Sequence, residues 1–358
     1  MTRLLTGVLV CWMLAAAAES LPPLPEGSFT YCVIPDTQLY RGEGAHVKQG
    51  RQAQTGPTRN PAFTSRVNWV ARNVTKERIF FVSHVGDIVD YKNEAQWSFA
   101  SNLMTRLDGL VPYGISPGNH DLAGEDSRDF NRYFPRERYL GKTWYAGGFD
   151  GCPGVKPGSI VSGGNANSCQ LVEAGGVKFV FLHLECNAPA PVLKWVDAIL
   201  TKHADRRAII CTHMAVGFRT RQIDRERRQL KDRVPPEEWF GVMDWTKCHG
   251  ANGVSAEEAW RTCFAKHPNL ILVVSGDQGP AIAARETRRG LAGNTVHLTL
   301  QDYPRKTNRD DWLRLYRFRG DMRAIDVITY SPSQDLVCEA VGHRTRRDCH
   351  VFTLPLDP

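Results

Sequence analysis

The chain has 358 residues, of which 42% are hydrophobic, 23% are charged and 9% are aromatic. This composition is ordinary for a globular protein and excludes the disordered, collagen-like and multi-span membrane classes. The formal net charge of +7 comes from 45 Lys and Arg against 38 Asp and Glu, which suits an anionic partner without indicating specific nucleic-acid binding.

The N-terminus has the pattern of an export signal. Arg3 precedes an apolar run over residues 4–18, which ends in three alanines. The run is too short to span a bilayer, and the proline-rich stretch after it interrupts any continuing helix. We therefore predict a signal peptide over residues 1–18, an exported protein (secreted or periplasmic) and no membrane span. A retained anchor or a buried helix is the alternative.

The rest of the chain, residues 26–358, is expected to form a single domain in which strands alternate with helices. Apolar, β-rich runs predict buried strands over residues 29–34, 79–85, 111–115, 177–184, 208–212 and 270–274. Segments with helical periodicity lie between them, over residues 62–76, 94–107, 191–203 and 256–267. This alternation is typical of α/β folds with a parallel-rich sheet. The tail, residues 296–354, alternates strand-like pieces with turns and predicts antiparallel strands that complete a second sheet.

The cysteines fall into two groups. Ten cysteines, less Cys11 in the predicted signal, leave nine, so at least one thiol is free or pairs outside the chain. An exported chain can keep disulfides, and short turn-rich spacings make three pairings reasonable hypotheses: Cys152–Cys169, Cys248–Cys263 and Cys338–Cys349. Three further cysteines lie in apolar runs and are expected to be small buried side chains: Cys32, Cys186 and Cys211.

Polar side chains follow five of the six predicted strands. The segments are Pro35-Asp36-Thr37-Gln38, Gly86-Asp87-Ile88-Val89-Asp90, Gly118-Asn119-His120-Asp121, Thr212-His213 and Ser275-Gly276-Asp277-Gln278-Gly279. One Asp after a strand is usually a turn former or a helix cap. Ligands of parallel sheets, however, bind beyond the carboxyl ends of the strands, and five such ends carrying Asp, Asn and His predict a cluster of metal ligands.

The order of these motifs resembles the calcineurin-like metallophosphoesterase superfamily, whose motifs are DxH, GDxxD, GNH(D/E), a single His and GHxH. GDIVD and GNHD are intact here, and the similarity spans about residues 29–280. The first motif, PDTQ, together with QDY at 301–303, WLR at 312–314 and TYSP at 329–332, resembles an exported subgroup of the superfamily. The resemblance implies a four-layer α/β-β-α sandwich of two mixed sheets, with a two-metal site between their tops.

The resemblance also implies a ligand for each metal ion. Asp36 would bind the first ion, Asp87 would bridge both, and Asn119 and His213 would bind the second. The implied reaction is hydrolysis of a phosphomonoester or phosphodiester by two-metal activation of water. His120 would then give a proton to the leaving group.

The same comparison suggests supporting roles around His120. Asp90 matches the carboxylate that orients this histidine, which is what a catalytic imidazole requires. Asn119 and His120 would also contact the phosphoryl group, whereas Asp121 is expected to be structural.

The sequence departs from the superfamily pattern in two motifs. Gln38 replaces the histidine of the first motif, and Asp277 and Gly279 replace both histidines of the last. Gln38 and Asp277 would supply oxygen ligands, and oxygen-rich coordination favours two ions of manganese, magnesium or calcium over zinc or iron. Gln278 or His84 is an alternative substitute, although His84 lies inside a strand, where a packed histidine is more common than a ligand.

Two questions about function stay open at this stage. Because imidazoles are lost, the alternative to an enzyme is a phosphate- or glycan-binding protein that keeps the fold with an incomplete metal site. A serine hydrolase is poorly supported, since no G-x-S-x-G motif is present. The basic run after His213 is either a solvated helix or a cover over the metals, and in the second case Arg219 and Arg221 would bind the phosphate. The substrate and the oligomeric state do not follow from the sequence.

Overall fold

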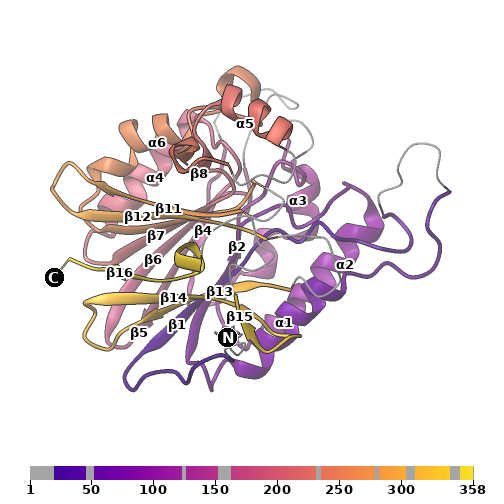
Figure 1. Ribbon diagram of the computed structural model, residues 1–358, viewed down its shortest axis with the longest axis horizontal. Coiled ribbons are helices and arrows are strands. Elements are labelled where there is room, and N and C mark those ends of the chain that lie inside the picture. Colours follow the sequence, from indigo (N-terminus) through magenta and orange to yellow (C-terminus); the bar gives the residue numbers. More distant parts are fainter. Residues whose placement is uncertain are drawn as a thin grey trace, which may run out of the picture.

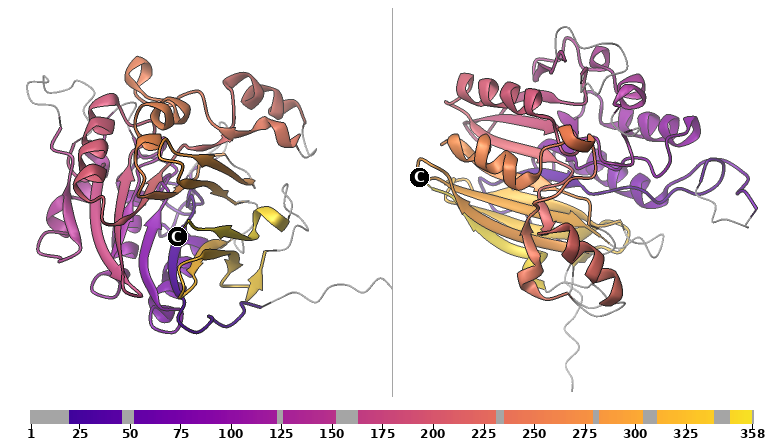
Figure 2. Two further views of the ribbon diagram at one scale, coloured as in Figure 1. Left: turned by 90° about the vertical axis from the view of Figure 1, so that its left-hand side faces the viewer. Right: turned by 90° about the horizontal axis from the view of Figure 1, so that it is seen from above.

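The computed structural model describes residues 20–45, 52–122, 126–151, 163–230, 235–278, 282–303, 311–338 and 347–357. The predicted signal peptide lies outside these ranges. Two mixed seven-stranded sheets pack against each other, and helices cover their outer faces (Figure 1; Figure 2). Among the described residues, the structure has no helix with the length and apolar character needed to cross a membrane.

The first sheet joins the beginning of the chain to its end, in the order β15-β14-β13-β1-β2-β3, with β16 paired to β14. Its parallel strands are β1 (Phe29–Ile34), β2 (Ile79–His84) and β3 (Tyr113–Ile115). Its antiparallel strands are β13 (Leu313–Phe318), β14 (Ala324–Ser331), β15 (Leu336–Val337) and β16 (Val351–Pro355). The carboxyl ends of β1, β2 and β3 therefore share one edge.

The second sheet has the order β11-β12-β10-β7-β6-β5-β4. Its parallel strands are β6 (Val177–Leu184), β7 (Arg207–Thr212), β10 (Leu270–Ser275) and β12 (Thr295–Asp302). Antiparallel strands flank them: β4 (Tyr145–Gly148), β5 (Ser168–Ala174) and β11 (Ile282–Arg289). A separate hairpin-like pair, β8 (Val216–Phe218) and β9 (Phe240–Val242), follows β7.

Helices cover both sheets from outside. The helices α1 (Pro61–Asn73), α2 (Glu94–Met104) and α3 (Arg128–Tyr133) belong to the first sheet, and α4 (Ala190–Lys202) and α6 (Ala256–Thr262) to the second. In Figure 1, α1 and α2 lie on one side of the strands, and α4 and α6 lie on the other. The N-termini of α1 and α2 are capped by asparagines, since Asn60 accepts from Phe63 N and Asn93 from Gln96 N.

Side-chain alternation along β1 explains the four layers. Cys32 and Ile34 belong to the apolar cluster that contains the residues of α1 and α2, whereas Tyr31 and Val33 belong to the cluster between the sheets. In that central layer Phe81 of β2 stacks on a partner from the second sheet, Phe181 of β6, with ring centroids 4.0 Å apart. Strands buried on both faces read as apolar runs, which is why the sequence located them. The predicted four-layer α/β-β-α sandwich is confirmed.

The tail differs from its prediction. The strand β12 pairs parallel with β10 in the second sheet, whereas β13 to β16 return to the first sheet and do not complete the second. The physical reason is burial on both faces of β13: Leu313 and Leu315 pack toward the helices, and Tyr316 and Phe318 pack between the sheets. Such a strand needs the interior position beside β1. The sequence also missed β11, whose charged residues alternate with small ones.

Two of the disulfide hypotheses are not met. Cys248 packs with Cys186 and Trp245, whereas Cys263 lies in another cluster, with its Sγ 3.5 Å from Leu193 O; both are buried thiols, so the Cys248–Cys263 bond is wrong. Cys338 and Cys349 share a small apolar cluster, but both are thiols. Cys152 lies outside the described residues, and its proposed pairing with Cys169 stays untested. The three cysteines predicted to be buried are so: Cys32, Cys186 and Cys211.

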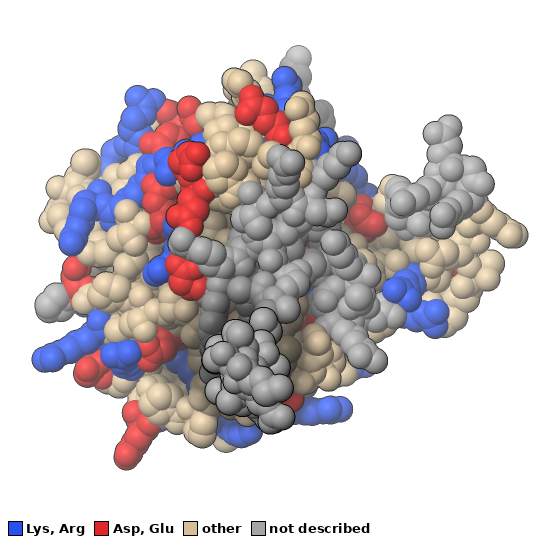
Figure 3. All heavy atoms as spheres, in the orientation of Figure 1, with Lys and Arg blue, Asp and Glu red and all other residues tan. Residues whose placement is uncertain are grey.

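The surface matches the nearly balanced charge of the chain. On the face drawn in Figure 3, the basic and acidic side chains that are visible beside the grey atoms are interspersed and not gathered by sign. Charge is concentrated instead at the strand ends, inside the molecule.

Candidate metal centre

The polar segments after the strands meet in one place. Asp36 follows β1, Asp87 follows β2, Asn119 follows β3, His213 follows β7 and Asp277 follows β10. An open pocket of about 300 Å³ lies there. Ten residues line it: Asp36, Gln38, Asp87, Asn119, His120, Arg227, Lys247, Asp277, Gln278 and Asp302. His213 is fully buried behind this wall.

Three side chains in this place converge as metal ligands do. Asp36, Asp87 and His213 each offer one ligand atom, and these atoms all lie within 4.8 Å of one another. His213 Nδ1 lies 2.9 Å from Val85 O. A carbonyl oxygen can only accept, so Nδ1 carries the hydrogen and Nε2 is left as the acceptor nitrogen. That nitrogen lies 3.2 Å from Asp87 Oδ1 and 3.5 Å from Asp277 Oδ1.

Two buried polar atoms in the centre have no hydrogen-bond partner among the described residues. They are His213 Nε2 and Asn119 Oδ1. A buried acceptor without a partner is costly, and such atoms usually mark a missing water or ion. Both atoms belong to residues expected to bind the second ion, so the donor set of this chain fits a metal ion there.

The backbone around the carboxylates explains why glycines flank them. Asp87 and Asp277 have left-handed backbone angles, with φ of 50° and 69°. A Cβ on Gly118 would lie 2.2 Å from Asp87 Oδ1, and one on Gly276 would lie 2.2 Å from Asp36 Oδ1. No side chain fits at such distances, so these glycines let the loops close on the carboxylates.

The electrostatics of the centre favour positive charge. Burial alone would raise the pKa of Asp87, but His213 and His120 hold this pKa below its ordinary value. Burial would lower the pKa of His213, yet the surrounding carboxylates, Asp87 foremost, raise it well above its ordinary value. Clustered buried carboxylates therefore stabilise a cation at their centre, as a metal site requires.

Gln38 and Asp277, which replace histidines of the superfamily, both lie in the centre. The side-chain nitrogen of Gln38 donates to Asp87 Oδ2. Asp277 accepts from Lys247 at Oδ1 and from Gln278 Nε2 at Oδ2, the latter at 3.1 Å. The structure thus places both residues beside the expected ligands, and their role as metal ligands stays a prediction.

His120 is held at the mouth of the pocket by two contacts. Its backbone N–H donates to Asp87 Oδ1 at 2.8 Å, and its Nδ1 lies 2.9 Å from the carbonyl oxygen of Asp90. The Asp90 carboxylate is farther away, at 3.6 Å. The carbonyl therefore fixes the tautomer, with hydrogen on Nδ1, and leaves Nε2 to exchange a proton. Orientation by residue 90 is present, but the carbonyl provides it more closely than the carboxylate.

Two neighbouring side chains have structural roles. Asp121 accepts backbone hydrogen bonds from Ile88, Val89 and Gly118 and so joins the second and third motifs. His84 is buried, with Nε2 on the Thr37 hydroxyl and Nδ1 accepting from Gly86 N. Both of its ring nitrogens are occupied, so it is a packed histidine and not a substitute ligand.

The basic side chains at the pocket differ from those expected. Arg219 lies 4.0 Å from Glu286, and Arg221 stacks over Trp245; neither lines the pocket. Arg227 and Lys247 line it instead. Arg227 belongs to the same basic run, on α5 (Arg221–Arg227), so only the register of the run was wrong. Lys247 follows no predicted strand, and nothing in its local sequence distinguishes it.

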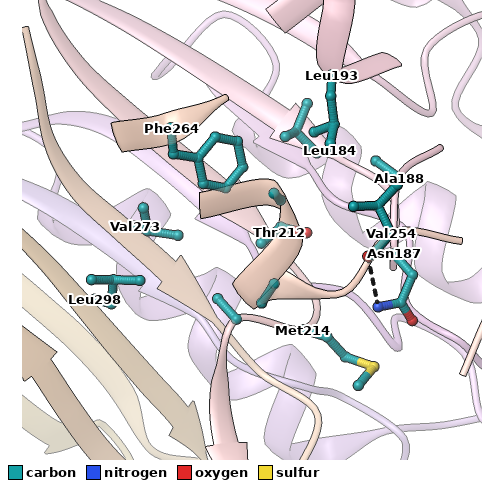
Figure 4. A pocket seen from close by; sticks show the side chains of 13 residues that line it. Leu184, Asn187, Ala188, Leu193, Thr212, Met214, Val254, Phe264, Val273 and Leu298 are labelled. Atoms are coloured by element: carbon teal, nitrogen blue, oxygen red, sulfur yellow. Dashed lines mark hydrogen bonds between the residues drawn. The ribbon is translucent and has the colours of Figure 1, made fainter. Parts of the chain in front are cut away.

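Two other features of the described residues are not comparable sites. A group formed by Asp197, Cys263 and His267 could hold an ion, but His267 Nε2 lies 3.0 Å from Asp197, and Cys263 contacts a backbone carbonyl. These protein partners account for the group. The pocket drawn in Figure 4, between the second sheet and α4, has a volume of about 20 Å³ and apolar walls, room for about one water molecule.

A four-layer sandwich with carboxylates, an amide and an imidazole converging at its strand ends is a protein of the metallophosphoesterase class. The model of the calcineurin-like phosphoesterase family matches residues 30–280, and the chain belongs to this family.

Individual relatives are distant. The chain is 24% identical over 323 residues to the uncharacterized protein YvnB of Bacillus subtilis (strain 168), which covers 88% of this chain and 20% of that protein. Among solved structures, purple acid phosphatase PPD1 from yellow lupin aligns with a TM-score of 0.50 and 11% identity, over 94% of this chain and 55% of that one. A 5'-nucleotidase precursor from Thermus thermophilus aligns with a TM-score of 0.42 and 10% identity, over 92% and 54%. The chain thus spans a fifth of its curated relative and about half of these structures, and the structural likeness shows the fold.

Proposed function

We propose that this chain is a metal-dependent phosphoesterase that hydrolyses a phosphomonoester or a phosphodiester. Family membership supports phosphoester chemistry in general. The observation that carries metal dependence is the approach of Asp36, Asp87 and His213, whose ligand atoms lie within 4.8 Å of one another in a buried centre. Three such side chains from separate strand ends have no common structural purpose without a cation.

The donor set suits two divalent ions. Asp36 and Gln38 would hold the first and Asn119 and His213 the second, with Asp87 between them. The further carboxylate, Asp277, makes the set rich in oxygen, which favours manganese, magnesium or calcium over zinc or iron. Such ions, when bound, supply an activated water and neutralise charge on the phosphoryl oxygens.

His120 is the proton donor in this proposal. Its hydrogen-bonded Nδ1 fixes the ring, and its side chain, 40% exposed, lies where a substrate enters. Protonated at Nε2, it gives that proton to the leaving oxygen as the P–O bond breaks. Asn119 beside it turns an amide toward the same phosphoryl group.

Hydrolysis assays test the proposal directly. Nitrophenyl phosphate and bis-nitrophenyl phosphate are offered to metal-free protein supplemented with manganese, magnesium, calcium or zinc in turn. Turnover that requires an oxygen-preferring ion is expected, and absence of turnover of either ester with every ion contradicts the proposal.

One observation favours a second candidate, a phosphate-binding protein without catalysis. Gln38 donates to Asp87 Oδ2, an oxygen that the first ion would need. Metal analysis separates the candidates: about two ions per chain supports the enzyme, whereas one weakly held ion with phosphate binding and no turnover supports the binder.

We also propose export, on the strength of the N-terminal pattern alone. Expression of the full chain in a bacterial host, followed by mass determination of the protein from the periplasm or the medium, tests it. A mature chain shortened by about the first 18 residues is expected.

A further inference from the structure

Lys247 brings a fixed positive charge into the pocket. It lines the pocket, and its ammonium group contacts the carboxylate of Asp277. The ammonium also lies 5.6 Å from the centre of the Trp245 ring, within the range of a cation–π contact. Its side chain keeps 26% of its surface exposed, so the group is held from two sides and still open to a ligand.

The backbone of Lys247 is anchored to the core. Its N–H donates to Asn187 Oδ1 at 2.8 Å, and the N–H of Cys248 donates to the same oxygen at 3.3 Å. The side-chain nitrogen of Asn187 in turn donates to Val254 O at 3.3 Å, the bond dashed in Figure 4. Asn187 is buried and has a left-handed backbone, with φ of 53°. One amide therefore ties both ends of residues 247–254 to the segment after β6, and the lysine is preorganised.

Asp277 holds the other end of this lysine. Its Oδ2 accepts from Gln278 Nε2, and the N–H of Gln278 donates to Asp302 Oδ2 at 2.9 Å. Both carboxylate oxygens of Asp277 are thus engaged by donors of this chain. In this arrangement Asp277 positions Lys247, and the centre gains an ammonium at the place where the superfamily motif carries a histidine.

We propose that Lys247 is a substrate-binding residue that donates to a phosphoryl oxygen of the ester bound in this pocket. The proposal rests on the proposed function, since the pocket must receive a phosphoester. An ammonium has three N–H donors, of which Asp277 uses one, and lysine binds phosphate as a compact point charge. Arg227, the other described cation lining the pocket, is paired with Asp224 at 2.9 Å. Lys247 is therefore the cation that the site offers to the anion.

Affinity for inorganic phosphate tests the assignment without requiring turnover. The full-length protein, loaded with the ion that supports activity, is titrated calorimetrically with phosphate as wild type, Lys247→Met and Lys247→Arg. Lys178→Met is the matched control, because Lys178 is 53% exposed and pairs with Asp205 away from the pocket. Metal content, and KM and kcat on nitrophenyl phosphate, are measured on each protein.

The expected pattern is specific to a substrate contact. Lys247→Met weakens phosphate binding and raises KM about tenfold or more, the size of one lost charge-assisted hydrogen bond. Metal content stays at the wild-type level, Lys247→Arg recovers most of the affinity, and Lys178→Met behaves as wild type. Wild-type phosphate affinity and KM in Lys247→Met overturn the proposal. Loss of metal in that variant also overturns it, because the lysine would then act through the metal centre.

A measurement on wild-type protein covers the case in which the variants fail to fold. Acetic anhydride labels Lys247 in metal-loaded protein with and without phosphate, and peptide mass spectrometry follows each lysine. Protection of Lys247 by phosphate, with Lys178 unchanged, is expected, and equal labelling overturns the proposal. Phosphate binding through Lys247 without turnover of any ester would leave this assignment standing while the enzymatic proposal fails.

Discussion

The backbone N–H of His120 donates to Oδ1 of Asp87 at 2.8 Å, so the third motif fixes the central carboxylate of the second. The same Oδ1 lies 3.2 Å from His213 Nε2, at the end of a strand in the other sheet. Asp87 is therefore the point at which the two sheets join chemically. Substitutions around this residue separate metal binding, proton transfer and folding from one another.

Asp87→Asn is expected to abolish the centre while keeping the fold. Asparagine tolerates the left-handed backbone of residue 87, so the change removes charge with little strain. Changes to groups that only support a metal ligand typically cost about 10- to 100-fold in affinity or activity, and loss of the central carboxylate should exceed this range. Metal titration and hydrolysis assays measure the effect. Asp197→Asn, at a carboxylate 49% exposed and outside the centre, is the control. Unchanged metal content in Asp87→Asn would contradict the site.

His120→Ala should lower kcat by about 10²- to 10⁴-fold, as loss of a general acid does, and leave metal content intact. Asp90→Asn should cost less than about tenfold, because the carbonyl of residue 90, which the substitution retains, makes the 2.9 Å contact with His120. Steady-state kinetics with parallel metal analysis checks both. An equal loss in the two variants would show that the Asp90 carboxylate, at 3.6 Å, is the group that matters.

The sequence predicted the centre better than the pocket around it. Strands buried on both faces appear as apolar runs, and the residue after each run necessarily lies at one sheet edge, which brought Asp36, Asp87 and His213 together on paper. Arg227 and Lys247 could not be found this way. Their places depend on a long connection between β7 and β10, whose path is set by contacts such as Asn187 with Lys247 N and not by periodicity. The return of β13 to the first sheet was missed because pairing partners are chosen by tertiary packing.

Gly118→Ala tests the close packing behind the bridging carboxylate. A methyl group at residue 118 would lie 2.2 Å from Asp87 Oδ1 and 2.3 Å from Asp87 N, so the carboxylate has to move. We expect metal affinity to fall about tenfold or more, since displaced ligands lose the geometry that an ion requires. Gly163→Ala is the control, because its nearest neighbour would be 3.9 Å away. Metal titration of both variants is decisive, and wild-type affinity in Gly118→Ala would show that the loop is softer than the structure indicates.

The pH dependence of stability should reveal the buried histidine between the sheets, His183. Its Nε2 lies 2.7 Å from Ser83 Oγ and its Nδ1 lies 2.7 Å from Gln170 Oε1, and burial lowers its pKa from 6.5 to about 3. Between these two values the unfolded chain takes up a proton at this residue and the folded protein does not. Stability is therefore fully present above pH 6.5 and falls as the pH is lowered toward 3. At pH 5 the loss amounts to about 2 kcal/mol, from 1.5 pH units at about 1.4 kcal/mol each. Urea unfolding of wild type and His183→Gln at pH 7.5, 6 and 5 measures it. Glutamine can keep a polar contact without titrating, so the variant, whatever its stability at pH 7.5, should lose about 2 kcal/mol less on going to pH 5. Parallel losses in the two proteins would mean that His183 already titrates in the folded state.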